Sequence, residues 1–98
     1  MTTERTILIA CRAFNVDVEL VRNGFRIRDA VDARRCAALL LARQGVGTRR
    51  MASVLCQSIR NAQRAIQSAQ ELAAVDQRFA QRLEAAWQEV QRQEVDRG

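Results

Sequence analysis

Apolar residues recur every three or four positions along most of the chain, which is the spacing of one face of an α-helix. The pattern predicts helices over residues 3–14, 18–22, 29–44, 49–55, 58–70 and 76–94. The chain of 98 residues has the length of one domain. We therefore predict a single compact all-α domain over residues 1–98.

Five of the six predicted helices, all but the short one at 18–22, have an apolar stripe that we expect to face the core. In chain order, the stripes hold Ile7, Leu8, Cys11 and Phe14; Ala33, Cys36, Ala37, Leu40 and Leu41; Met51, Val54 and Leu55; Ala62, Ala65 and Ile66; and Phe79, Leu83, Ala86, Trp87 and Val90. We expect Trp87 to pack inward rather than to contact a partner protein.

Short polar residues and glycines between the stripes predict where helices begin and end. Residues whose side-chain oxygen can accept a main-chain N–H bond stand at four predicted starts: Asp17, Asp29, Thr48 and Ser58. Asn15 ends the first stripe, Asn23-Gly24 predicts a turn, and Gly45 lies just past the third helix. Between the second and third helices, residues 25–28 ("FRIR") form a predicted basic loop.

Residues 49–70 combine a short helix, a tight turn at Cys56-Gln57 and a longer helix with a polar outer face. This order is typical of a helix-turn-helix, whose second helix enters the DNA major groove. The outer face of the second helix carries Arg60, Asn61, Gln63 and Arg64. Arginine suits guanine, and asparagine and glutamine suit adenine, so the face is typical of a base-reading helix.

Charge is distributed unevenly along the chain. Residues 33–70 hold seven arginines and no acid, whereas residues 71–98 hold four arginines and six acids. All 16 basic residues are arginine, the net charge is +5, and the isoelectric point is near 10.8. A basic middle segment of this kind indicates a polyanionic partner.

Several other functions find no support in the sequence. There is no histidine, the cysteines Cys11, Cys36 and Cys56 are far apart, and no glycine-rich phosphate loop occurs, so we expect neither an enzyme nor a metal or other cofactor. No apolar run approaches the ~20 residues that span a bilayer. We expect a cytoplasmic, nucleoid-associated protein with small buried thiols.

The stretch "ARRCAALLLARQGVGTRRMASVLCQSIRNAQRAI" resembles the C-terminal DNA-binding domain of the bacterial replication initiator DnaA. Residues 33–40 correspond to the family's helix start "aRqiamyL", Met51-Ala52 take the place of its "IA" pair, and residues 55–62 lie over its "GRDHSTV" signature. The resemblance extends over roughly residues 5–90. It implies a helix-turn-helix fold, a phosphate contact by Arg34, and a loop that places Arg26 or Arg28 in the minor groove.

The chain departs from that family within the signature. Gln57, Ser58 and Ile59 replace its arginine, aspartate and histidine, and Arg60-Asn61 replace its hydroxyl pair. Those family positions contact bases and phosphates, so the resemblance does not imply the initiator's target sequence. These 98 residues also hold no ATPase domain. Small DnaA-like domains of this kind occur in phage-related regulators, and the DNA-binding half of alphaproteobacterial gene-transfer-agent activators is the nearest type.

We therefore predict sequence-specific binding to double-stranded DNA by a transcriptional regulator of prophage-like or gene-transfer-agent genes, acting with a second protein. Two alternatives stay open: a replication-accessory DNA-binding protein, and a helical adaptor whose basic face binds an acidic protein. The predicted DNA contacts are Arg26, Arg28, Arg34, Arg35, Arg49, Arg50, Gln57, Ser58, Arg60, Asn61, Gln63 and Arg64.

Some of these residues also have a purely structural interpretation. Arg34 could form a surface ion pair with Asp29 or Asp32, and residues 25–28 could be a solvated charged loop. Ile59 could belong to the core or meet a thymine methyl group.

Overall fold

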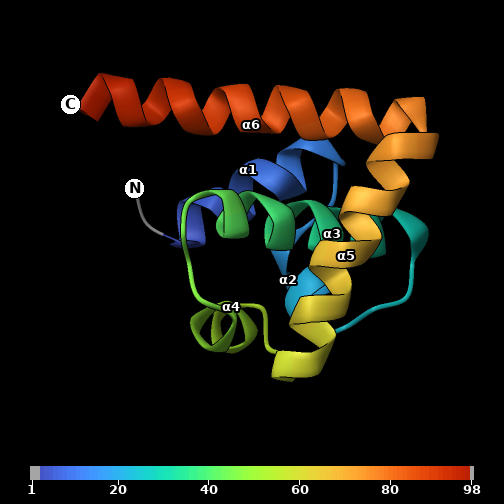
Figure 1. Cartoon of the computed structure of the whole chain (residues 1–98). Coiled ribbons are helices and arrows are strands. Elements are labelled where there is room, and N and C mark those ends of the chain that lie inside the picture. Colours follow the sequence, from blue (N-terminus) through green and yellow to red (C-terminus); the bar gives the residue numbers. More distant parts are fainter. Residues whose placement is uncertain (1–2, 98) are drawn as a thin grey trace.

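Helices account for the secondary structure in the computed structural model of the protein, which describes residues 3–97 (Figure 1). In chain order they are α1 (Thr3–Ala13), α2 (Val18–Arg22), α3 (Arg28–Arg43), α4 (Thr48–Val54), α5 (Ile59–Val75) and α6 (Gln77–Arg97). No strand occurs within the described range. The predicted all-α fold is confirmed.

Helix α3 lies at the centre, and each of the other five helices packs against it. More than half of its length is buried: Ala30, Asp32, Ala33, Cys36, Ala37, Ala38, Leu39, Leu40 and Leu41. A helix enclosed on several sides cannot keep a broad polar face. Its alanines leave room for neighbouring helices to approach closely.

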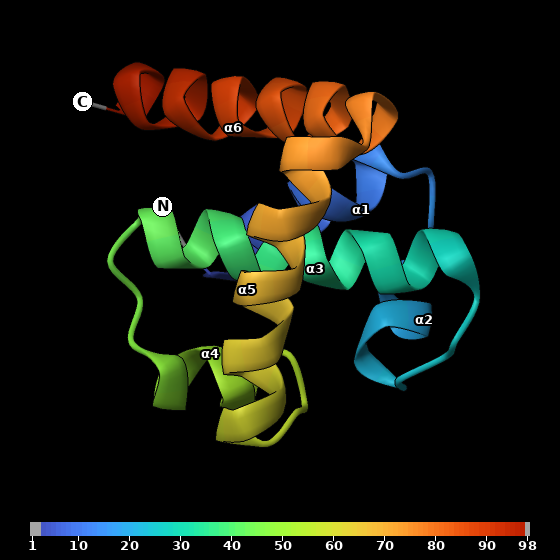
Figure 2. The ribbon, with the colours of Figure 1, turned by 45° about the vertical axis from the view of Figure 1, so that its right-hand side comes forward.

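Helices α6 and α4 lie at opposite ends of the molecule. Helix α6 extends across one end, where it packs on α1 and α5, and α4 lies at the other end beside the start of α5 (Figures 1 and 2). Helix α5 spans the distance between the two ends and crosses α3 (Figure 2). The short helix α2 packs on α1 and α3.

Most of the predicted inward stripes are buried, with a few exceptions. Leu8 is 43% exposed, because α1 turns the positions around Ile7 and Ala10 inward and leaves Leu8 outside. Val54 and Ile66 are half-buried. Trp87 is half-buried as well, with the Arg43 guanidinium 5.3 Å from its ring centroid. The expectation that Trp87 packs inward therefore holds for only part of its ring.

Several predicted helix boundaries are confirmed. The Asp17 side chain accepts a bond from the Glu19 N–H at the start of α2, and the Ser58 side chain accepts one from the Asn61 N–H, each 3.1 Å long. At the start of α6, the Asp76 carboxylate accepts a bond of 3.1 Å from the Phe79 N–H. Positive φ angles occur at four predicted turn residues: Asn15 (57°), Gly24 (70°), Gly45 (83°) and Cys56 (56°).

Other predicted boundaries are wrong by one or more residues. The N-cap of α3 is Ile27 instead of Asp29, and that of α4 is Gly47 instead of Thr48; neither makes a side-chain capping bond. Both caps have extended backbone angles, which suffice to begin a helix, and Asp29 stands in the first turn, where a negative charge is favourable. Helix α5 continues to Val75, beyond the predicted end at residue 70.

The aromatic residues of the core give a stability prediction. Phe79 is 2% exposed, and its ring lies 5.5 Å from that of Phe14, so Phe79→Ala should lower the free energy of unfolding by about 3–5 kcal/mol. Trp87→Ala should cost less, since half-buried Trp87 vacates less core volume. Urea denaturation of the two variants beside the unaltered protein measures both losses. Equal losses, or a larger loss for Trp87→Ala, would contradict this ranking.

Candidate nucleic-acid interface

A tight turn, residues 55–58, joins α4 to α5. Leu55 is fully buried and anchors the turn in the core. Cys56 adopts a left-handed conformation with φ of 56°, and the next N–H, that of Gln57, bonds to the Ala52 carbonyl at 2.8 Å. A left-handed residue other than glycine costs about 1–3 kcal/mol and persists only where its surroundings hold it. The turn is therefore fixed, and it sets α5 against both α4 and α3.

Helix α5 has an alanine face and a polar face. Its buried residues are Ala62, Ala65 and Ala69, which pack close to α3. The predicted base-reading side chains are all exposed: Arg60, Asn61, Gln63 and Arg64. Small residues on the buried face keep the helix axis near the core, while the long polar side chains extend outward. Ile59, at the first position, is 42% exposed and so does not belong to the core.

A groove of about 490 Å³ separates the start of α5 from α2 and the loop at residues 23–27; we call it the basic groove. No acidic residue is among those that line it: Val21, Arg22, Gly24, Arg26, Val31, Arg34, Leu55, Cys56, Gln57, Ser58 and Asn61. Five of the predicted DNA contacts are therefore brought together here. Arg22 is an addition that sequence reasoning missed, because its place at the groove depends on how α2 lies relative to the start of α5.

Gln57 differs from the other predicted contacts in the groove. It is half-buried, and its Oε1 is enclosed without a hydrogen-bond partner. The amide nitrogen is the other polar atom of this side chain. Enclosure of Oε1 limits its use as an acceptor for a ligand.

The Arg34 side chain hydrogen-bonds to main-chain carbonyls that border the basic groove. Its Nη2 donates to the carbonyls of Val21 (3.0 Å) and Phe25 (3.2 Å), and its Nε donates to Val21 (3.2 Å). Burial, and then the positive charge of Arg35, lower the pKa of Arg34 from its ordinary value. Arg34 thus closes the end of α2 and fixes the base of the 23–27 loop. The phosphate contact implied by the family resemblance stays a prediction beside this structural role.

Arg28 and Arg35 pair with acids instead of lining the groove. Arg28 Nη2 lies 3.8 Å from Asp76 and its Nε 4.0 Å from Asp32, while Arg35 lies 3.3 Å from Asp32. Arg28 is the first residue of α3, so the prediction that it belongs to the basic loop is wrong. The reason is the extended backbone of Ile27, which makes it the N-cap two residues before the predicted cap at Asp29. Arg26 is thus the exposed arginine of the loop.

Arg49 and Arg50 are exposed in the first turn of α4. Helix α4 lies at the same end of the molecule as the start of α5 (Figure 2). Arg50 also lines a polar hollow with Gln44 and Glu94. Basic side chains on α2, the 23–27 loop, α4 and α5 therefore share one end of the molecule.

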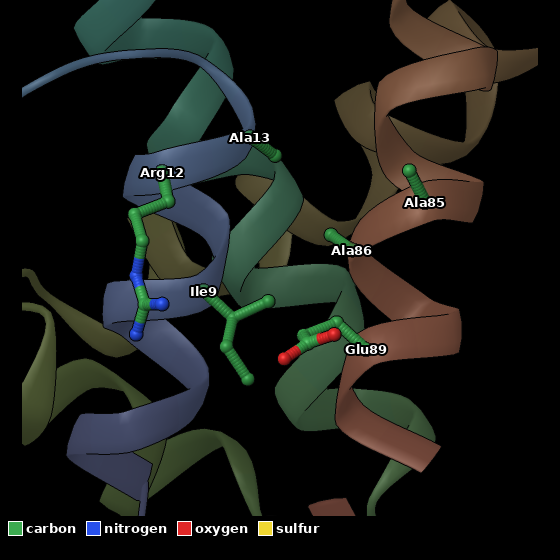
Figure 3. A pocket seen from close by; sticks show the side chains of 6 residues that line it. All are labelled: Ile9, Arg12, Ala13, Ala85, Ala86 and Glu89. Atoms are coloured by element: carbon green, nitrogen blue, oxygen red, sulfur yellow. The ribbon is translucent and has the colours of Figure 1, made fainter. Parts of the chain in front are cut away.

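The opposite end, between α1 and α6, has a small and largely apolar hollow of about 280 Å³ (Figure 3). Ile9 and Ala13 of α1 face Ala85 and Ala86 of α6 across it, and Arg12 lies along the outer side of α1 (Figure 3). Glu89, at its edge, pairs with Arg92 and accepts a bond of 2.9 Å from Gln93. This end therefore combines small apolar side chains with locally paired charges.

The cysteines differ in environment. Cys11 and Cys36 are buried, and burial raises their pKa values to about 11 and about 12. The prediction that all three thiols are buried is wrong for Cys56, whose left-handed backbone turns it outward. Among residues 3–97, no three cysteine or acidic side chains gather in an arrangement that could hold a metal ion.

The helices of the described range are too short or too polar for any one of them to cross a membrane. Comparisons with models of protein families, with curated proteins and with solved structures find no match. The DnaA resemblance therefore stays an expectation from the sequence.

Replacing Arg34 tests its structural role. Arg34→Ala should lower the free energy of unfolding by about 1–3 kcal/mol, because the Val21 and Phe25 carbonyls lose a charged donor. Arg34→Lys should restore only part of the loss, because an ammonium group cannot reproduce the planar fork of donors. Urea denaturation measures both variants. An Arg34→Ala protein as stable as the unaltered one would show that these bonds contribute nothing.

Proposed function

We propose that the protein binds double-stranded DNA through a helix-turn-helix formed by α4, the 55–58 turn and α5. The observation that carries the proposal is the exposed polar face on the first two turns of α5: Arg60, Asn61, Gln63 and Arg64. An α-helix with its side chains is about 10–12 Å across, which matches a major groove about 12 Å wide. These four side chains are also the types that bond to guanine and adenine edges.

The electrostatics of the same end support this proposal. The basic groove beside α5 is lined by Arg22, Arg26 and Arg34 and by no acid. Arg49 and Arg50 are exposed on α4. Phosphates flanking the major groove would meet these side chains, which would supply affinity that does not depend on sequence. Bases would be read by α5.

The biological role that fits best is transcriptional regulation of prophage-like or gene-transfer-agent genes, in line with the sequence resemblance. Such a regulator acts by occlusion or by recruiting a second protein. The candidate recruiting surface is the outer face of α6, where Glu84 and Arg92 are exposed. Its mixed charges would give selective but modest association. No cofactor or small-molecule substrate enters this proposal.

Alanine replacements on α5 test base reading. On a site selected from a random duplex library, Asn61→Ala or Arg64→Ala should weaken binding by about 1–3 kcal/mol and relax the preference at one base pair. Gln70→Ala is the matched control, because Gln70 is exposed on the same helix but lies six residues beyond Arg64 and nine beyond Asn61, further from the groove. Gel shifts at one fixed salt concentration measure each affinity.

The outcomes of this experiment separate the alternatives. A loss that is uniform across sequences would show that Asn61 and Arg64 only hold phosphates. If the unaltered protein bound no duplex, even at low salt, the DNA-binding proposal would be wrong. An adaptor with a basic face would then be the better interpretation.

Arg26 and Arg28 form a matched pair for the loop. Arg26 is exposed at the basic groove, whereas Arg28 pairs with Asp32 and Asp76. Arg26→Ala should weaken binding more on sites with an AT-rich flank than with a GC-rich flank, because a narrow AT-rich minor groove attracts arginine. Arg28→Ala removes the same charge and should leave the ratio between the flanks unchanged. Gel shifts measure, for each variant, the ratio of its affinities for the two flank types. If Arg26→Ala weakened binding equally on both, Arg26 would contribute only a charge attraction that does not depend on the flanking sequence.

A further inference from the structure

Three large exposed apolar residues are sequence neighbours of residues that line the basic groove. Over the described residues, the exposed large hydrophobic residues are Leu8, Phe25, Ile27, Ile59 and Val75. Phe25 (49% exposed) and Ile27 (55% exposed) stand on either side of Arg26, and Ile59 follows Ser58; both Arg26 and Ser58 line the groove. Single exposed apolar residues are ordinary, but Phe25 and Ile27 flank a groove-lining arginine on one short loop, which indicates a contact surface.

The backbone that carries Phe25 and Ile27 is held in place. The Phe25 N–H donates to the Leu20 carbonyl at 3.1 Å, and its own carbonyl accepts from Arg34 Nη2 at 3.2 Å. The Ile27 carbonyl accepts from the Val31 N–H at 3.0 Å, as the N-cap of α3. The two side chains therefore project from a fixed support, and ordering the loop would add little to the cost of binding.

The charged side chains near Phe25 and Ile27 indicate the chemistry of the partner. Arg26 separates them, and Arg22 and Arg34 line the adjoining groove without any acid. A protein surface that combines cations with exposed apolar groups suits a ligand with anionic edges and an apolar interior. Duplex DNA has both, in its phosphates and its stacked bases. The groove is also continuous with the start of α5 through Ser58 and Asn61, so the same duplex can reach both.

We propose that Phe25 and Ile27 act as an apolar wedge that enters the minor groove next to the site of α5, unstacks a base step and kinks the duplex. This inference rests on the proposed function. Apolar wedges of phenylalanine, leucine or isoleucine unstack base steps in minor-groove proteins and bend DNA toward the major groove. Arg26, between the two, neutralises phosphate where the backbones converge. Flexible TA and CA steps kink most easily and are the preferred place of insertion.

Ligase-catalysed circularisation tests the wedge without a known target site. The probe is a mixed-sequence duplex of about 100 base pairs, shorter than the persistence length of about 150, so it closes rarely unless a protein bends it. At low salt the unaltered protein should promote minicircles. Phe25→Ala/Ile27→Ala should still shift the fragment in a gel but give about tenfold fewer minicircles, because the kink is lost.

Leu8→Ala/Val75→Ala is the matched control. It also removes two exposed apolar side chains, but from α1 and from the far end of α5. This variant should give as many minicircles as the unaltered protein. Circular dichroism verifies that both double variants are helical, as expected from the solvent exposure of all four side chains.

A second readout uses the unaltered protein alone. A duplex with 2-aminopurine at its TA steps should brighten on binding, because stacking quenches this base. A protein that shifts DNA but neither closes it nor brightens the probe would overturn the wedge and leave the proposed function standing. Equal closure by Phe25→Ala/Ile27→Ala would also overturn the wedge. Failure of the unaltered protein to shift any duplex would overturn the proposed function, and the wedge with it.

Discussion

The enclosure of α3 by the other helices is the constraint on which the rest of the structure depends. A chain of 98 residues has a small core, and here a single helix, α3, packs against all five others. Its alanines let those helices approach, and Leu39, Leu40 and Leu41 fill the space between them. Asp32, 8% exposed, is a charge on this buried helix, and it is paired with Arg28 and Arg35. Such pairing is required where a carboxylate leaves water.

Through Arg34, the central helix α3 also fixes the position of a surface loop, residues 23–27. Helix α2 has five residues, too few to be stable without tertiary contacts. The Arg34 guanidinium, based on α3, bonds to carbonyls at the end of α2 and in the loop that follows. The position of the loop is thus set by the central helix. A rigid support of this kind is what a protein needs if a loop is to reach a ligand at the same time as a distant helix.

The sequence predicts what depends on neighbouring residues and misses what depends on distant ones. The Asp17 and Ser58 caps and the left-handed Gly45 were predictable, because each acts within a few residues of itself. The exposed face of α5 was predictable from helical periodicity. The Arg28–Asp76 pair was not, because its partners lie far apart along the chain and meet only through the packing of the helices.

Two further misses have the same origin. Periodicity allowed Leu8 to face the core, but the packing of α1 against both α3 and α6 fixed a neighbouring stripe as the buried one. The basic groove likewise depends on how α2 sits against the start of α5, so Arg22 gave no signal of its own as a member of the site. The predicted face of α5 therefore agrees with the structure, whereas predictions that depend on how elements pack together do not.

The separation of charge along the chain becomes a separation in space. The acid-free segment, residues 33–70, supplies α4 and the first turns of α5, whereas α6, across the other end, carries four arginines and four acids and so has no net charge (Figure 1). On a duplex, phosphates would attract the first end more strongly than the end formed by α6, whose arginines and carboxylates balance. Long-range electrostatics alone would then favour the orientation that brings α5 to the bases. The polar face of α5 would need to distinguish sequences only within that one orientation.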